Sequence, residues 1–142
     1  MTTLDFHFNA SSKVDYTCKL LRKATGTGAR VAVLTPAALL GRLDQALWTF
    51  SPIDFVAHVC APCSTLAMAH SQVLLCDDTQ SAQGYTVLVN LTDALPVDFA
   101  RFDRVIEVVT ADAPDRVCAR ERWKQYIALG YDITRHDLQT NS

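Results

Sequence analysis

DRVCARERWKQYIALGY, residues Asp115–Tyr131, is the stretch around which the expected fold is organised. It follows a strand-like run, Arg104–Val109, and a proline, and its apolar residues recur at helical spacing. We therefore predict one amphipathic helix of about four turns. When the helix is wound at about 100° per residue, one face is apolar and is expected to be buried. That face consists of Cys118, Ala119, Tyr126 and Leu129.

A neighbouring stripe of the same helix is basic and aromatic. It consists of Arg116, Arg120, Trp123, Lys124 and Ile127, with no acidic residue among them. Arginine can hold a carboxylate through two parallel hydrogen bonds, and tryptophan and isoleucine offer an apolar wall beside it. The stripe therefore fits an acidic ligand that also carries an apolar group. The alternative is a solvated helix edge whose charges only maintain solubility, and spacing alone favours that alternative.

Length and composition indicate an ordinary globular protein. A chain of 142 residues with 49% apolar and 20% charged residues can bury one full hydrophobic core. The net charge of −2 argues against direct strong binding to nucleic acid, which requires a basic field. No apolar run approaches the roughly 18 residues of a membrane span, and the N-terminus lacks the features of a signal peptide. Five cysteines without such a signal predict reduced thiols and a cytoplasmic location.

Strand-like and helix-like segments alternate along the chain. Strands are predicted at Thr3–Phe8, Arg30–Leu34, Phe55–Val59, Gln72–Cys76, Tyr85–Leu91 and Arg104–Val109, with an edge strand at Asp132–Asp137. Further helices are predicted at Lys13–Lys23 and from Pro36 to about Trp48, with one helical turn at Val97–Arg101. This alternation predicts an α/β fold with an open, twisted, mostly parallel sheet and helices on both faces. Without a repeat or a linker, residues 1–142 are expected to form a single domain.

Several short motifs fail as catalytic or metal sites. The sequence Thr25-Gly26-Thr27-Gly28 closes a helix, whereas a phosphate-binding glycine loop opens one, so we interpret it as a helix cap and turn. Cys60 and Cys63 form a C-x-x-C, but no second pair completes a zinc set. We expect neither a metal nor a required disulfide there, and no motif provides positive support for an enzyme.

Several motifs together resemble the chi subunit of bacterial DNA polymerase III. They are Arg42-Leu43-Asp44-x-x-Leu47-Trp48, then Phe55-Val56-x-His58, and the later run Ala119–Tyr126 followed by Gly130-Tyr131. The resemblance extends from about Leu4 to Asp137 and is weakest in the loop Val59–Ser71, where the C-x-x-C is not part of the family pattern.

The resemblance implies a non-catalytic accessory subunit with a Rossmann-like fold but no nucleotide site and no cofactor. Chi pairs with the psi subunit, which connects it to the clamp loader. It also binds the acidic C-terminal tail of single-stranded DNA-binding protein, which ends in Pro-Phe with a free carboxylate. A small α/β nucleotide-binding protein or enzyme that shares only the architecture remains the alternative, because fold does not decide function.

The resemblance also assigns residues to the two partners. The positions that match tail-contacting residues of the family are Val109, Arg116, Arg120, Trp123 and Lys124. The positions that match the apolar residues facing psi are Trp48 and Phe55. From composition alone, these two aromatics fit either the core or an exposed patch that binds a partner, and composition favours the core.

Overall fold

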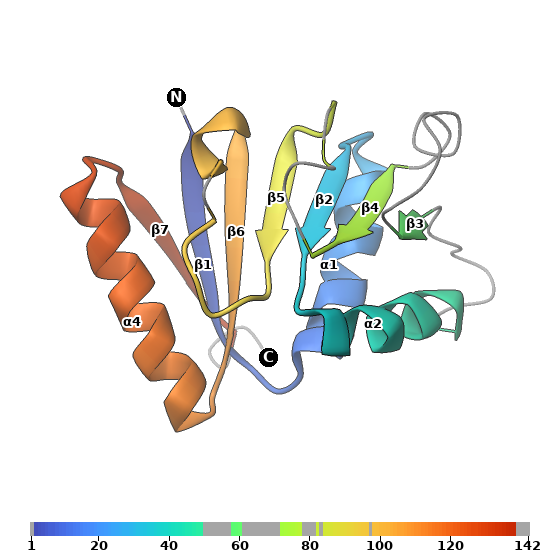
Figure 1. The fold of residues 1–142 in the computed structure, drawn as a ribbon, viewed down its shortest axis with the longest axis horizontal. Helices are drawn as coiled ribbons and strands as arrows, with labels where there is room; N and C mark the ends of the chain where they lie inside the picture. Colours follow the sequence, from blue (N-terminus) through green and yellow to red (C-terminus); the bar gives the residue numbers. More distant parts are fainter. Residues whose placement is uncertain are drawn as a thin grey trace.

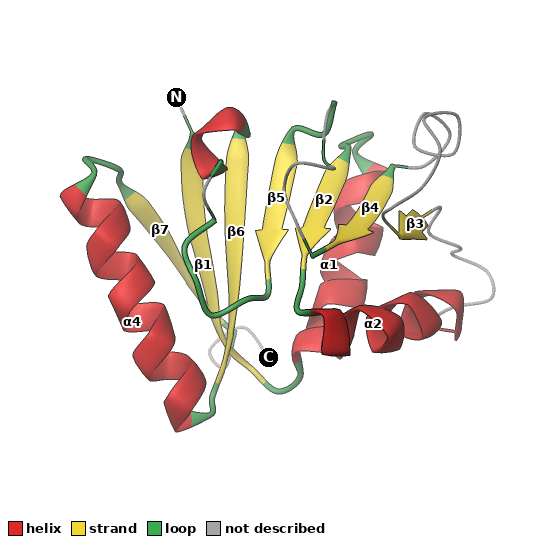
Figure 2. Cartoon of the chain, in the orientation of Figure 1, coloured by secondary structure: helices red, strands yellow, loops and turns green. Residues whose placement is uncertain are grey.

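In the part of the chain that the structure describes, seven strands form one sheet in which every neighbouring pair is parallel (Figures 1 and 2). The computed structural model describes residues 2–49, 58–60, 72–77, 82, 84–96 and 98–138. The strands are β1 (Thr3–Ala10), β2 (Val31–Leu34), β3 (His58–Cys60), β4 (Val73–Cys76), β5 (Val87–Asn90), β6 (Arg104–Thr110) and β7 (Ile133–Asp137). Their spatial order is β3-β4-β2-β5-β6-β1-β7, so β7 lies at one edge, as predicted.

Helices cover both faces of this sheet, which confirms the predicted fold class. They are α1 (Lys13–Gly26), α2 (Ala37–Thr49) and α4 (Ala113–Ala128), with a short 3-10 turn, η2 (Phe99–Arg101). Alternate residues of each strand point to opposite faces. Val31 and Val33 of β2 pack in the core shared with α1 and α2, whereas Ala32 packs in the core that includes α4. None of the described helices is long and apolar enough to cross a bilayer.

The long basic helix has the predicted position but a different buried face. Ala119 and Tyr126 are buried, as expected, whereas Leu129 is 58% exposed and Arg122 is 2% exposed. Leu129 is exposed because α4 ends before it, and Gly130 then turns the chain with a left-handed φ of 91°. Assigning Leu129 to the buried face was therefore wrong.

Arg122 is buried because it neutralises a carboxylate in the core. Its Nε lies 3.0 Å from Glu107 Oε1, in an ion pair that joins α4 to β6. The Tyr126 hydroxyl donates to Glu107 Oε2 at 2.8 Å, and the Asn90 amide donates to both carboxylate oxygens. Burial raises the pKa of Glu107, while Arg122 and these hydrogen bonds lower it. Burial and the adjacent Glu107 raise the pKa of Tyr126, so its hydroxyl remains a donor.

We predict that Arg122→Ala lowers the free energy of unfolding by about 3 kcal/mol or more, because it leaves the Glu107 carboxylate buried without a cation. Arg120→Ala, on the exposed side of the same helix, should change it by no more than about 0.5 kcal/mol. Urea denaturation of both variants measures the difference. Equal losses would show that the buried pair contributes nothing specific.

A histidine pair lies on the face of β1 and β7 opposite α4. The rings of His7 and His136 are 4.4 Å apart, and His7 Nδ1 is hydrogen-bonded to the Tyr16 hydroxyl of α1. His136 Nε2 lies 3.5 Å from Asp5 Oδ1. Burial, followed by the charge of His136, lowers the pKa of His7 to about 4, although Asp5 acts in the opposite direction. His7 is therefore neutral in the native protein near neutral pH.

This depressed pKa predicts an acid-sensitive contribution to stability. The unfolded chain binds a proton at His7 below about pH 6.5, whereas the native chain does so only near pH 4. The contribution of neutral His7 to the free energy of unfolding is fully present above pH 6.5. It is lost as the pH falls from 6.5 toward 4. We expect a loss on the order of 1 kcal/mol, because solvent screens this half-buried side chain. In urea titrations at the two ends of the window, His7→Gln should reduce the loss; an unchanged loss would assign it to other groups.

Candidate peptide-binding groove

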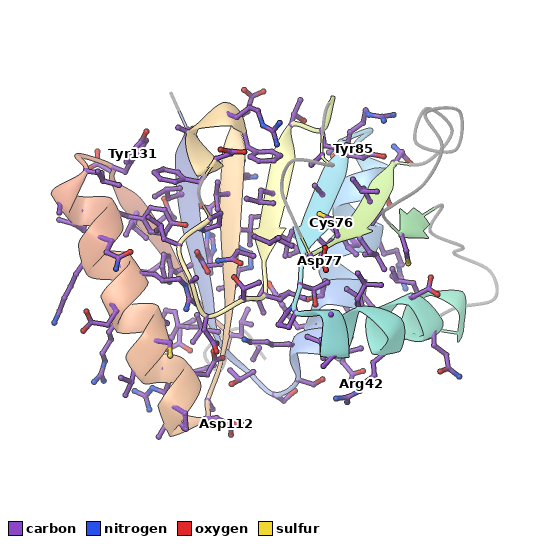
Figure 3. The ribbon with its side chains drawn as sticks, viewed as in Figure 1. Arg42, Cys76, Asp77, Tyr85, Asp112 and Tyr131 are labelled. Carbon is purple, nitrogen blue, oxygen red and sulfur yellow. The ribbon has the colours of Figure 1, made fainter. Side chains whose placement is uncertain are left out.

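A groove lies between α4 and the strands β1, β6 and β7, with a cavity volume of about 380 Å³. Figure 1 shows α4 beside this end of the sheet, and Figure 3 labels Asp112 and Tyr131, which flank the helix. The lining residues are Phe6, Phe8, Val109, Arg116, Ala119, Arg120, Trp123, Lys124 and Arg135. The structure therefore brings together all five residues that the resemblance assigned to the tail.

The interior of the groove is apolar and aromatic. Phe6 of β1 meets Trp123 edge to face, with ring centroids 5.0 Å apart, and packs similarly on Tyr126 behind it. Val109, at the end of β6, is buried, and Trp123 is half-buried, so its ring offers a partly exposed surface. These rings are held by the core, and an aromatic or aliphatic side chain can pack on them with little rearrangement.

The rim of the groove is positively charged. Arg116, Arg120 and Lys124 follow one another at four-residue spacing along α4, and all three are exposed. Within the described chain neither arginine has an ion-pair partner, and Lys124 meets only the exposed Glu121, at 3.8 Å. No acidic residue of the described ranges lines the groove. These cations are consequently available to an anion from solution.

Four residues that line the groove were not assigned to it from the sequence: Phe6, Phe8, Ala119 and Arg135. Phe6 and Phe8 alternate along β1, a pattern that places both on one face but does not say what lies above it. Arg135 lies on β7 with its guanidinium 5.2 Å from the centre of the Phe8 ring. Ile127, which the stripe analysis placed beside Trp123, is 50% exposed and is not part of the lining.

The two residues assigned to psi lie largely outside the described part of the chain. Trp48 belongs to α2 through its backbone, but its side chain and all of Phe55 lie outside the described residues. Cys60 is half-buried at the end of β3, and Cys63 lies outside the described residues. Across the described residues, no group of three or more potential ligands among His, Cys, Asp and Glu could hold a metal ion.

A second cavity, of about 530 Å³, occupies the position where ligands bind in many open α/β sheets, beyond the carboxyl end of β6. Lys13 lies 3.1 Å from Asp115, which also accepts hydrogen bonds from the backbone and hydroxyl of Thr110. Although burial acts in the opposite direction, these contacts lower the pKa of Asp115. Asp93 and Asp112 also line the cavity, so carboxylates surround its one lysine and disfavour a phosphate.

The glycine-containing segment Thr25–Gly28 closes a helix and does not open one. Helix α1 ends at Gly26, and the Thr27 amide donates to the Ala24 carbonyl at 3.1 Å. Gly28 then adopts a left-handed φ of 86°. The interpretation of this segment as a helix cap and turn is confirmed.

These features define a class: an open, parallel α/β domain with an aromatic, cation-rimmed groove beside its edge strand. The model of the family "DNA polymerase III chi subunit, HolC" matches residues 1–134, and the chain belongs to that family. It is 29% identical over 143 residues to DNA polymerase III subunit chi of Pseudomonas aeruginosa, covering 97% of this chain and 98% of the relative.

A solved structure shares the architecture. The C-terminal domain of the DEAD-box protein Dbp5 superposes with a TM-score of 0.59 at 12% identity, covering 96% of this chain and 91% of that one. At such low identity the likeness concerns the fold alone.

Proposed function

We propose that this protein is a non-catalytic accessory subunit that links the clamp loader of DNA polymerase III to single-stranded DNA-binding protein during replication in the cytoplasm. Its partners would be the psi subunit and the acidic C-terminal tail of single-stranded DNA-binding protein. The observation that supports the proposal best is the convergence of the five assigned tail residues in one groove.

The groove complements such a tail in shape and in charge. The terminal phenylalanine would enter between α4 and β6, where Phe6, Val109 and Trp123 provide an apolar surface. Arg120 would pair with a carboxylate of the tail, and Arg116 and Lys124 would attract the remaining acids. A short peptide must be ordered on binding, so we expect an affinity of about 1 μM that weakens as salt rises.

The chemistry of the lining favours binding over catalysis. Its charged members in the described chain are three arginines and one lysine. An arginine stays protonated in proteins and cannot exchange a proton near neutral pH. No histidine, cysteine or carboxylate from the described residues reaches the groove as an acid, base or nucleophile. Such a site can hold an anion without transforming it.

We predict that Arg120→Ala weakens binding of an acidic peptide ending in Pro-Phe about tenfold, and that Lys124→Ala has a smaller effect. The forked guanidinium can bind a carboxylate through two hydrogen bonds, whereas Lys124 already lies near Glu121. Isothermal calorimetry at fixed salt measures both. Arg42→Ala, which removes an exposed cation from α2, serves as the control and should bind like wild type.

The psi surface provides a separate prediction. Phe55→Ala should weaken psi binding at least about thirtyfold, because loss of an interface aromatic commonly costs about 2 kcal/mol or more. Tail binding by the same variant should remain at the wild-type level. A pull-down titration against psi, together with the peptide calorimetry, tests both surfaces. If Phe55→Ala lost the peptide while Arg120→Ala retained it, the two faces would have been assigned the wrong way round.

A further inference from the structure

The groove has a second charged wall, supplied by the edge strand β7. In the parallel register of β1 and β7, Arg135 lies beside Phe6, and its guanidinium covers the ring of Phe8. Arg135 lines the groove across from the α4 cations and is itself exposed. An anion in the groove therefore meets positive charge from a helix on one side and from a strand on the other.

The two walls of the groove contact different side chains of an extended peptide. On α4, Arg116, Arg120 and Lys124 are one turn apart, or about 6 Å along the axis. Successive side chains of an extended peptide point in opposite directions and are about 3.3 Å apart. The cations of α4 alone would reach only every second side chain of the peptide, because such side chains are about 6.6 Å apart. A cation on the opposite wall is required to reach the residue between them.

We propose that Arg135 is a specificity-determining residue that lets the groove bind tails with consecutive acidic residues. One acid of an adjacent pair faces α4, while its neighbour faces Arg135 on β7. The proposal rests on the function proposed above and adds the sequence pattern that this chain recognises. If Arg135 only packed on Phe8, its loss would change the binding of all peptides alike.

Two peptides of identical length and composition distinguish these roles. Both end in Pro-Phe with a free carboxylate; one carries two adjacent aspartates followed by a serine, and the other has the serine between the aspartates. In the second peptide both aspartates face α4 and pair with two of its cations, so wild type should bind the two peptides about equally. Arg135→Gln should weaken binding of the adjacent-acid peptide about fivefold, the upper range for an exposed ion pair, and should leave the other peptide unchanged. Arg135→Lys, which keeps the charge, should bind both peptides like wild type.

Arg42→Gln is the matched control, because it removes the same charge from α2, away from the groove. Figure 3 labels Arg42 on that helix. The control should bind both peptides like wild type, and circular dichroism should show that all variants are folded. If Arg135→Gln weakened binding of both peptides alike, or of neither, the role of Arg135 would be overturned. Failure of wild type to bind either peptide would instead reject the proposed function.

Discussion

The Glu107 carboxylate, buried in β6, is the constraint on which the groove depends. A charge in the core must be met by a cation and by donors, and here these come from α4 and from β5. Arg122 and Tyr126 are one turn apart on α4 and both bond to this one carboxylate. Together they fix the rotation of α4 about its axis and its position against the sheet.

Once that rotation is set, the position of each other residue of α4 follows from helical geometry. Arg120 lies two residues before Arg122, about 200° around the helix, and so points away from the buried carboxylate. Arg122 is 2% exposed and paired with Glu107, whereas Arg120 is exposed at the rim of the groove. Two arginines of one helix thus have different roles. Glu107 determines that Arg122 is buried in the core and that Arg120 is exposed at the groove.

The elements of the fold could be predicted because each has a local signal. Alternation of strands and helices, the proline in the first turn of α4 and the glycines at the end of α1 are properties of neighbouring residues. The exceptions have a different cause. Arg122 looks polar in any periodicity analysis, and only its pairing with Glu107 explains its burial. Leu129 looks apolar, but α4 ends one residue earlier, at Ala128.

The same distinction between local signals and contacts between distant residues applies to the candidate site. Its helical half, including Arg116, Arg120, Trp123 and Lys124, could be predicted because spacing within one helix decides which residues share a face. In its sheet half only Val109 was assigned, through the family resemblance. Phe6 and Arg135 were missed, because they become neighbours only through the pairing of β1 with β7, across more than a hundred residues of sequence. No local pattern specifies that register.

The register of β1 within the sheet keeps its acidic residue away from the groove. Along β1, Phe6 and Phe8 face α4, whereas Asp5 and His7 face the opposite side, where Asp5 lies near Arg104 and His136. A shift of β1 by one residue would exchange the two sets, because side chains alternate in a strand. Asp5 would then lie beneath the arginines and neutralise them. After His7 the pairing of β1 with β6 is irregular, and Asn9 adopts a left-handed φ of 67°. The Asn9 amide donates to Asp137 Oδ1 at 2.9 Å, a contact that ties β1 to β7 in the register in which no acid of the described residues lines the groove.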